Sequence, residues 1–151
     1  MRVTYKSFPF RNRGVPERIK VWRPVLPVQI IHNHATSKRF EAVVDTGSDY
    51  CLFQAEIGAS IGIKVNNGPE GDLGGVISGP RSKVYFHTVK LKVGSDILEI
   101  KAGFCWDLSD NLLGQTGFFD NFVVTFDPTF ALVALGSNLF VLVFSYRHGG
   151  I

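Results

Sequence analysis

The fold is predicted from the stretch Ala42-Val43-Val44-Asp45-Thr46-Gly47-Ser48, in which three apolar residues lead to an Asp, a hydroxyl residue and a glycine. The apolar run is typical of a buried strand, so it carries the carboxyl group of Asp45 to the end of that strand. A carboxylate beside the core is costly unless hydrogen bonds or a partner compensate it. A tight turn through Thr46 and Gly47 can supply backbone N–H donors. Because Asp-Thr-Gly also occurs in ordinary turns, the tripeptide alone makes Asp45 a candidate site residue but does not indicate a reaction.

Two further segments carry information. Asn111–Gly114 places two apolar residues before a glycine that lies 69 residues after Asp45. Gly68–Pro80 contains five glycines in thirteen positions. Glycine permits positive φ and lowers the cost of motion, so this segment is either an ordinary surface loop or a β-hairpin that folds over a ligand, with its tip near Gly74 and Gly75.

Most of the chain has the period-two hydrophobic pattern of strands. Helical periodicity is limited to Gln54–Ile61 and Gln115–Asn121. Many short strands at near-regular spacing predict an all-β barrel or sandwich, and the chain shows no internal repeat. Strands are expected over residues 25–32, 39–44, 89–93, 97–102, 122–126 and 131–135.

Taken together, these segments resemble the retropepsin-like, single-domain aspartic proteases over residues 25–135. The resemblance implies a closed β-barrel with one or two short helices that acts as a C2 homodimer. It divides the chain into a basic N-terminal leader (1–23), a protease domain (24–136) and a C-terminal tail (137–151). The apolar run Leu139–Phe144 of that tail is either an interface strand of the dimer or packs on its own protomer.

The resemblance also implies roles for individual residues. Ser48 carries a hydroxyl able to bias the Asp45 carboxylate, and Asp49 occupies a position that contacts the substrate backbone in retroviral members. Where those members commonly continue with Arg and then Asn or Asp, this chain has Gln115 and Thr116, so the brace of the dimer is expected to differ. The implied catalytic residues are Asp45, Thr46 and Gly47; the substrate-binding residues are Ser48, Asp49, Gly74, Gly75, Val76 and Ile77; and the structural support is Leu112, Leu113 and Gly114.

Aspartic-protease chemistry uses two carboxylates, whereas this chain has one Asp-Thr-Gly. The expected function is therefore peptide-bond hydrolysis by a homodimer whose two Asp45 side chains activate a water, with a peptide or protein substrate and no metal or cofactor. The alternative is a non-catalytic, dimeric peptide-binding or scaffold module on the same fold.

Charge and composition bound the remaining classes. The 151 residues are 45% hydrophobic and 19% charged, which favours a folded, soluble domain. Residues 1–23 carry a net charge of +6 although the whole chain has +3. This leader is either a mobile, solvated segment or an arm that binds nucleic acid, and nucleic acid is the less expected partner.

The cysteines, the histidines and the apolar segments of the sequence predict no metal site, disulfide framework or membrane span. Cys51 and Cys105 have neither metal-site nor disulfide-framework spacing, so packed thiols are expected, with a redox contact as the alternative. His32 and His34 have the period-two spacing of two metal ligands on one strand face, but they are expected at a polar hairpin tip with no third ligand nearby. No apolar run reaches the length of a membrane span or signal peptide, and a cytoplasmic location is expected.

Overall fold

The computed structural model describes residues 2–9, 20–74, 81–127, 132–136 and 141–144. The chain divides into two compact units, one formed by Met1–Leu26 with Asn121–Ile151 and the other by Pro27–Asp120. The predicted residues Gly75, Val76 and Ile77 lie outside the described residues.

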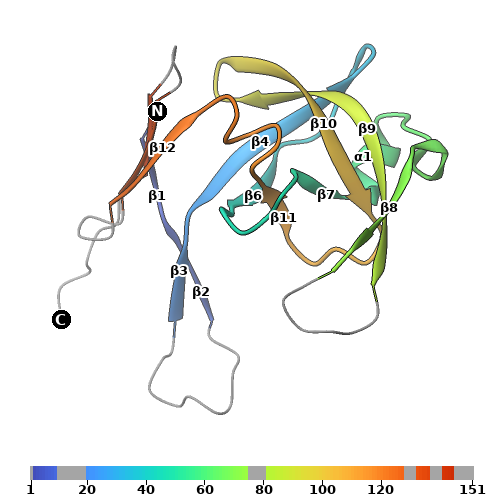
Figure 1. The fold of residues 1–151 in the computed structure, drawn as a ribbon. Coiled ribbons are helices and arrows are strands. Elements are labelled where there is room, and N and C mark those ends of the chain that lie inside the picture. The colour runs from blue at the N-terminus through green and yellow to red at the C-terminus, as the bar shows by residue number, and fades with distance from the viewer. Residues whose placement is uncertain (1, 10–19, 75–80, 128–131, 137–140, 145–151) are drawn as a thin grey trace. The chain divides into compact units, whose positions relative to one another are not determined.

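The unit Pro27–Asp120 is built on one sheet that closes into a ring (Figure 1). The strand order is β5-β4-β6-β11-β7-β10-β9-β8, and an additional pairing of β4 with β9 closes a barrel of six strands, leaving β5 and β8 as extensions. The bounds are β4 Val25–His32, β5 Ala35–Thr36, β6 Phe40–Val44, β7 Leu52–Gln54, β8 Glu70–Leu73, β9 Ser82–Val93, β10 Asp96–Cys105 and β11 Asn111–Leu113.

The long hairpin β9–β10 shows how the hydrophobic pattern gives the strands. Val89, Leu91 and Val93 are buried, and they alternate with side chains that are exposed or half-buried. Gly94 turns the chain at a φ of 61°, and the antiparallel register then pairs Asp96 with Val93. The alternation therefore points one face of the hairpin into the barrel, as the sequence predicts.

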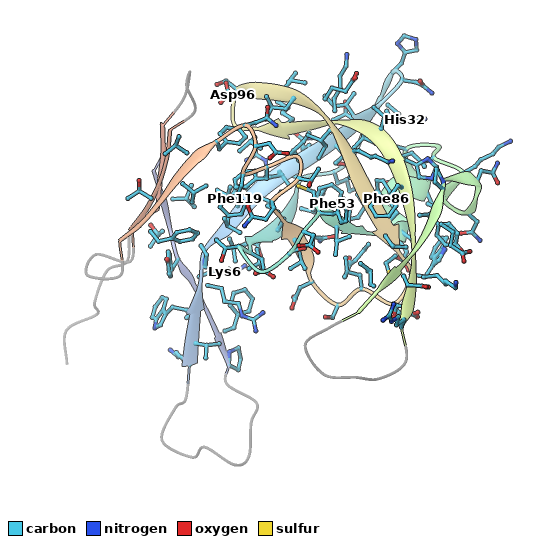
Figure 2. The ribbon with its side chains drawn as sticks, in the orientation of Figure 1. Lys6, His32, Phe53, Phe86, Asp96 and Phe119 are labelled. Carbon is cyan, nitrogen blue, oxygen red and sulfur yellow. The ribbon has the colours of Figure 1, made fainter. Side chains whose placement is uncertain are left out.

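Aromatic rings fill the interior of the barrel. Phe53, Phe104 and Phe118 are fully buried. The Phe53 ring lies 6.0 Å from Phe104 and 5.4 Å from Phe40, centroid to centroid. Figure 2 shows Phe53 inside the ring of strands and Asp96 at its edge. Tilted and edge-on pairs of this kind add to the stabilisation that burial alone gives.

One of the two predicted helices is confirmed. The α-helix α1 spans Ala55–Ser60, within the predicted segment, and a single 3-10 turn, η1, spans Val65–Asn67. The helix predicted over residues 115–121 is wrong, because these residues form turns. Gly117 has a φ of +98°, which ends any right-handed helix, and the Asp120 carboxylate accepts from the Gly117 N–H at 3.2 Å.

The other unit contains the two ends of the chain. The strands β1 (Arg2–Thr4), β12 (Val123–Asp127), β13 (Leu132–Gly136) and β14 (Val141–Phe144) form a second closed sheet. β12 and β13 pair antiparallel, and each is shifted by one residue from the strands predicted over residues 122–126 and 131–135. β14 pairs with β12 and β13 of the same chain, and the interface strand of the dimer stays a prediction.

The basic leader predicted over residues 1–23 contains strands. β2 (Lys6–Pro9) and β3 (Lys20–Arg23) form an antiparallel hairpin that pairs Ser7 with Trp22, and β1 pairs with β13 and β14. The sequence does not predict these strands, because a count of charges gives no information on strand pairing. None of the helices in the described parts of the chain is long and apolar enough to cross a membrane.

Candidate active site

Asp45 follows a buried strand, as the sequence predicts. In β6, Ala42 and Val44 are buried. β6 runs parallel to β11 with Val44 opposite Leu113, and the Asp45 N–H donates to the Leu113 carbonyl at 3.0 Å. The two sequence motifs, which are far apart in the chain, are therefore adjacent strands, and the second fixes where the Asp45 turn begins.

The turn itself holds the Asp45 carboxylate. The Gly47 N–H donates to Asp45 Oδ1 at 2.9 Å, and the Ser48 N–H donates to the Asp45 carbonyl at 3.3 Å. The Asp45 side chain is half-buried, so this donor compensates part of its lost hydration. The Ser48 hydroxyl donates to the Tyr50 carbonyl at 2.8 Å. The predicted bias of Ser48 on the Asp45 carboxylate is therefore not the contact that the structure shows.

Two loops cross at the end of the turn. The Gln115 N–H donates to the Ser48 carbonyl and the Thr116 N–H to the Asp49 carbonyl, both at 2.8 Å. A Cβ at Gly114 would lie 2.2 Å from the Tyr50 carbonyl oxygen and 2.6 Å from that of Ser48. Only glycine fits this crossing, which gives the predicted supporting role of Gly114 a steric cause.

The side chains of two amides, Asn111 and Gln115, connect the same segments. Buried Asn111 accepts from the Gln54 N–H at 2.9 Å and donates to the Glu41 carbonyl at 3.1 Å, so it ties β6 to the start of α1. Gln115 Nε2 donates to the Thr46 carbonyl at 2.8 Å. The sequence draws attention to Gln115 only as a departure from a family pattern, and the role of Asn111 has no signal in the sequence beyond its place beside Leu112.

A cleft of about 500 Å³ opens at Asp45. Gly47, Ser48, Asp49 and Leu112 also line it, whereas Leu113 is fully buried and contacts the core instead. The strand β8 contributes to the same cleft, and it pairs antiparallel with β9 in the hairpin predicted to cover a ligand. Among the described residues, the predicted members of the cleft wall are joined by others that sequence reasoning missed: Tyr50, Leu52, Asp72, Leu73, Ser82, Cys105, Asp107 and Leu108.

The two thiols are packed in the core, as expected. Cys51 and Cys105 are free and buried. Burial raises the pKa of the Cys51 thiol from 9.0 to about 12; the Gly114 backbone lowers this pKa and the charge of Asp120 raises it further, both by less than burial does. A thiol with this pKa stays neutral and unreactive near pH 7. Among the residues that the structure describes, no cluster of His, Cys, Asp or Glu could hold a metal ion.

Trp106 does not belong to the cleft wall. Its side chain is exposed, and its Nε1–H donates to Asn66 Oδ1 at 2.9 Å. Its neighbours Cys105 and Asp107 do line the cleft.

The fold is similar to those of two solved structures, a protease-like domain and a protease. The retroviral protease-like domain of Ddi1 from Leishmania major superposes with a TM-score of 0.50 at 13% sequence identity, over 80% of this chain and 94% of that one. EIAV protease complexed with the inhibitor HBY-793 superposes with a TM-score of 0.44 at 17% identity, over 70% of this chain and 88% of that one. No protein-family model matches the sequence, and no curated protein does. The six-strand barrel and the likeness to the Ddi1 domain show an all-β, retropepsin-like fold.

Proposed function

We propose that this chain is an aspartic endopeptidase in which two Asp45 carboxylates, one from each protomer of a C2 homodimer, activate a water for peptide hydrolysis. The observation that carries the proposal is the setting of Asp45. Its carboxylate accepts from the Gly47 N–H at 2.9 Å and lines a cleft of about 500 Å³ on a retropepsin-like fold. A half-buried acid with a fixed orientation in a cleft is suited to general acid–base chemistry.

The second carboxylate is assigned to a second copy of the chain. Asp49, Asp72 and Asp107 also line the cleft, but Asp45 alone belongs to an Asp-Thr-Gly turn. An isologous contact places a residue near its own copy without further sequence information. In this arrangement the exposed Thr46 side chain hydrogen-bonds across the two-fold axis and braces both turns.

The chemistry follows from two acids at contact distance. Both cannot be ionised comfortably there, so the pair shares one proton, as is established for aspartic proteases as a class. The ionised Asp45 takes a proton from the water while that water attacks the peptide carbonyl. The protonated Asp45 donates towards the carbonyl oxygen, and a proton later reaches the leaving amine. Acid–base help of this kind contributes about 10²–10⁴-fold, and positioning adds to it.

The substrate is an extended peptide in this proposal. It lies between the Asp45 turn and the β8–β9 hairpin, with Gly47 and Asp49 contacting its backbone and residues 74–77 closing over it. Leu52, Leu73 and Leu112 line the described part of the cleft, which favours apolar side chains next to the cut.

The test compares peptide cleavage by the wild type and by Asp45→Asn between pH 4 and pH 7, with Asp96→Asn as a control of the same chemistry at the β9–β10 turn. The wild type and Asp96→Asn should cut, while Asp45→Asn should lose activity by about 10²–10⁴-fold or more and still form a dimer in size-exclusion chromatography. Equal cleavage by the wild type and Asp45→Asn would remove Asp45 from the mechanism. Peptide binding without cleavage by any of the three would favour the non-catalytic peptide-binding module.

A further inference from the structure

One peptide group in the active-site turn is held at both of its polar ends. The carbonyl of Thr46 accepts from Gln115 Nε2 at 2.8 Å, and the N–H of Gly47 donates to Asp45 Oδ1 at 2.9 Å. These two groups belong to the same planar unit, the peptide bond between Thr46 and Gly47. In a trans peptide the C=O and N–H point in opposite directions, so the two contacts together fix its rotation.

The backbone of Gln115 is anchored independently of its side chain. The Gln115 N–H donates to the Ser48 carbonyl at 2.8 Å, and Gly114 occupies a crossing that excludes a side chain. The Gln115 side chain itself is exposed and makes no contribution to the core. A substitution at this position therefore removes the amide donor without removing the crossing of the two loops.

We propose that Gln115 is a positioning residue: its amide holds the Thr46–Gly47 peptide group so that the Gly47 N–H stays directed at the Asp45 carboxylate. This inference rests on the proposed function for its catalytic meaning. Donation to the carbonyl also polarises the peptide group, which strengthens the N–H at its other end as a donor. Gln supplies this donor without a positive charge beside the two acids, which an Arg would add.

Other charged groups face the same cleft and stay constant in the test. The carboxylates of Asp49, Asp72 and Asp107 line it, and no Lys, Arg or His does so among the described residues. Lys83 Nζ lies 3.1 Å from Asp72 Oδ1 and 2.6 Å from Glu70 Oε1. Because a substitution of Gln115 alters none of these groups, a difference in pH profile between variants at this position reports on the amide.

The sharpest variant is Gln115→Glu, which preserves the shape of the side chain. An ionised Glu has no proton to donate and places a negative oxygen against the Thr46 carbonyl, whereas a protonated Glu has an O–H donor. Its contact should therefore fail at pH 7 and return near pH 4, close to the ordinary pKa of about 4.3 for Glu. Gln115→Ala lacks the donor at every pH. Asn67→Ala, an exposed amide at the end of η1, is the control.

The primary measurement is the NMR hydrogen-exchange protection of the Gly47 amide, which needs no turnover. We expect protection to fall about fivefold in Gln115→Ala at both pH values, the loss of one hydrogen bond, and to be unchanged in Asn67→Ala. In Gln115→Glu it should fall by at least as much at pH 7 and recover to within about twofold of the wild type at pH 4. Equal protection in the wild type and Gln115→Ala, or no recovery in Gln115→Glu, would overturn the proposal.

Cleavage kinetics on the same variants separate this inference from the proposed function. We expect kcat to fall about fivefold in Gln115→Ala with KM little changed, and the loss in Gln115→Glu to be confined to the higher pH. If neither the wild type nor any variant cuts peptides, but the protection of the Gly47 amide changes as described, the proposed function fails and the positioning role of Gln115 stands. If the wild type cuts and the protection pattern is absent, the positioning role fails alone.

Discussion

Asp45 and Cys51 lie six positions apart and carry titratable side chains in opposite environments. The Asp45 carboxylate is half-buried at the cleft and accepts from a backbone N–H, so its charge has a donor and a route to water. The Cys51 thiol is fully buried, and burial raises its pKa to about 12. The Asp45 carboxylate is therefore accessible to a ligand in the cleft, whereas the Cys51 thiol acts as a small apolar side chain in the core.

The raised pKa of Cys51 predicts a loss of stability at alkaline pH. Since its folded-state pKa of about 12 exceeds 9.0, the unfolded chain releases this proton first as the pH rises. The contribution is fully present below pH 9 and is lost progressively towards pH 12. From pH 8.5 to 10.5, the free energy of unfolding should fall by about 1–2 kcal/mol more in the wild type than in Cys51→Ala.

Urea unfolding of both proteins at the two pH values measures this difference. All other side chains are the same in both proteins, so their effects cancel in the comparison. An identical pH dependence in wild type and Cys51→Ala would contradict the assignment.

The sequence predicts which backbone segments form the site better than it predicts the contacts of their side chains. Asp45 and Leu112, which belong to the two short motifs, line the cleft, and Gly114 lies where the Asp45 turn and the segment after β11 cross. The Ser48 hydroxyl and the Gln115 amide could not be placed, because each contacts a carbonyl whose position depends on how two distant loops cross. A motif specifies residue types, but the donor and acceptor pairs arise only in the folded chain.

The crossing of the Asp45 turn with the segment after β11 is the structural element on which the site depends. Parallel pairing of β6 with β11 brings the two segments together, and Gly114 lets the backbones pass. Hydrogen bonds from Gln115 and Thr116 to the carbonyls of Ser48 and Asp49 then join them. Strand pairing and one missing side chain thus set the orientation of the turn.

Gly114→Ala should therefore be strongly destabilising. Its Cβ would lie 2.2 Å from the Tyr50 carbonyl oxygen, and backbone on both sides would have to move. We expect a loss of about 3 kcal/mol or more in the free energy of unfolding, as for severe overpacking. Gly74→Ala is the matched control, because among the residues that the structure describes its Cβ would meet only Arg81 Nε, at 3.8 Å. Its stability should stay within about 0.5 kcal/mol of the wild type.

Chemical denaturation of the three proteins gives the comparison. A Gly114→Ala protein as stable as Gly74→Ala would show that the loops can separate without cost, and the account of the crossing would be wrong.

Strands and helices can be predicted from the sequence where the hydrophobic periodicity and the turn residues indicate the same structure. They are missed where these two signals disagree. Residues 89–93 alternate cleanly and meet the chain reversal at Gly94, so the β9–β10 hairpin follows from the sequence. The segment 115–121 has helical spacing, but Gly117 at a positive φ forms a turn. In the basic leader, β2 and β3 pair although the net charge of this segment gives no sign of strand pairing.

The closure of the barrel and the pairing of the chain ends belong to the molecule as a whole. β4 pairs with β9 across the ring, and β1 pairs with β13 and β14 although more than 120 residues separate them in the sequence. Hydrophobic period cannot reveal such non-local pairings, because it reports which face of a strand is buried and not which strand lies beside it. The spacing of short strands predicts a barrel or a sandwich, and only the resemblance to a known family favours the barrel.

The central claim is that one active site needs two chains, each supplying its own Asp45. Mixing wild type with Asp45→Asn at a fixed total concentration, after unfolding and refolding together so that protomers exchange, tests it directly. If both carboxylates are required, activity should follow the square of the wild-type fraction, so that an equal mixture retains about a quarter of the activity, since only dimers with two Asp45 side chains work. Activity that falls in direct proportion to the wild-type fraction, with half remaining in the equal mixture, would mean that each chain acts with its own carboxylate and would contradict the shared site.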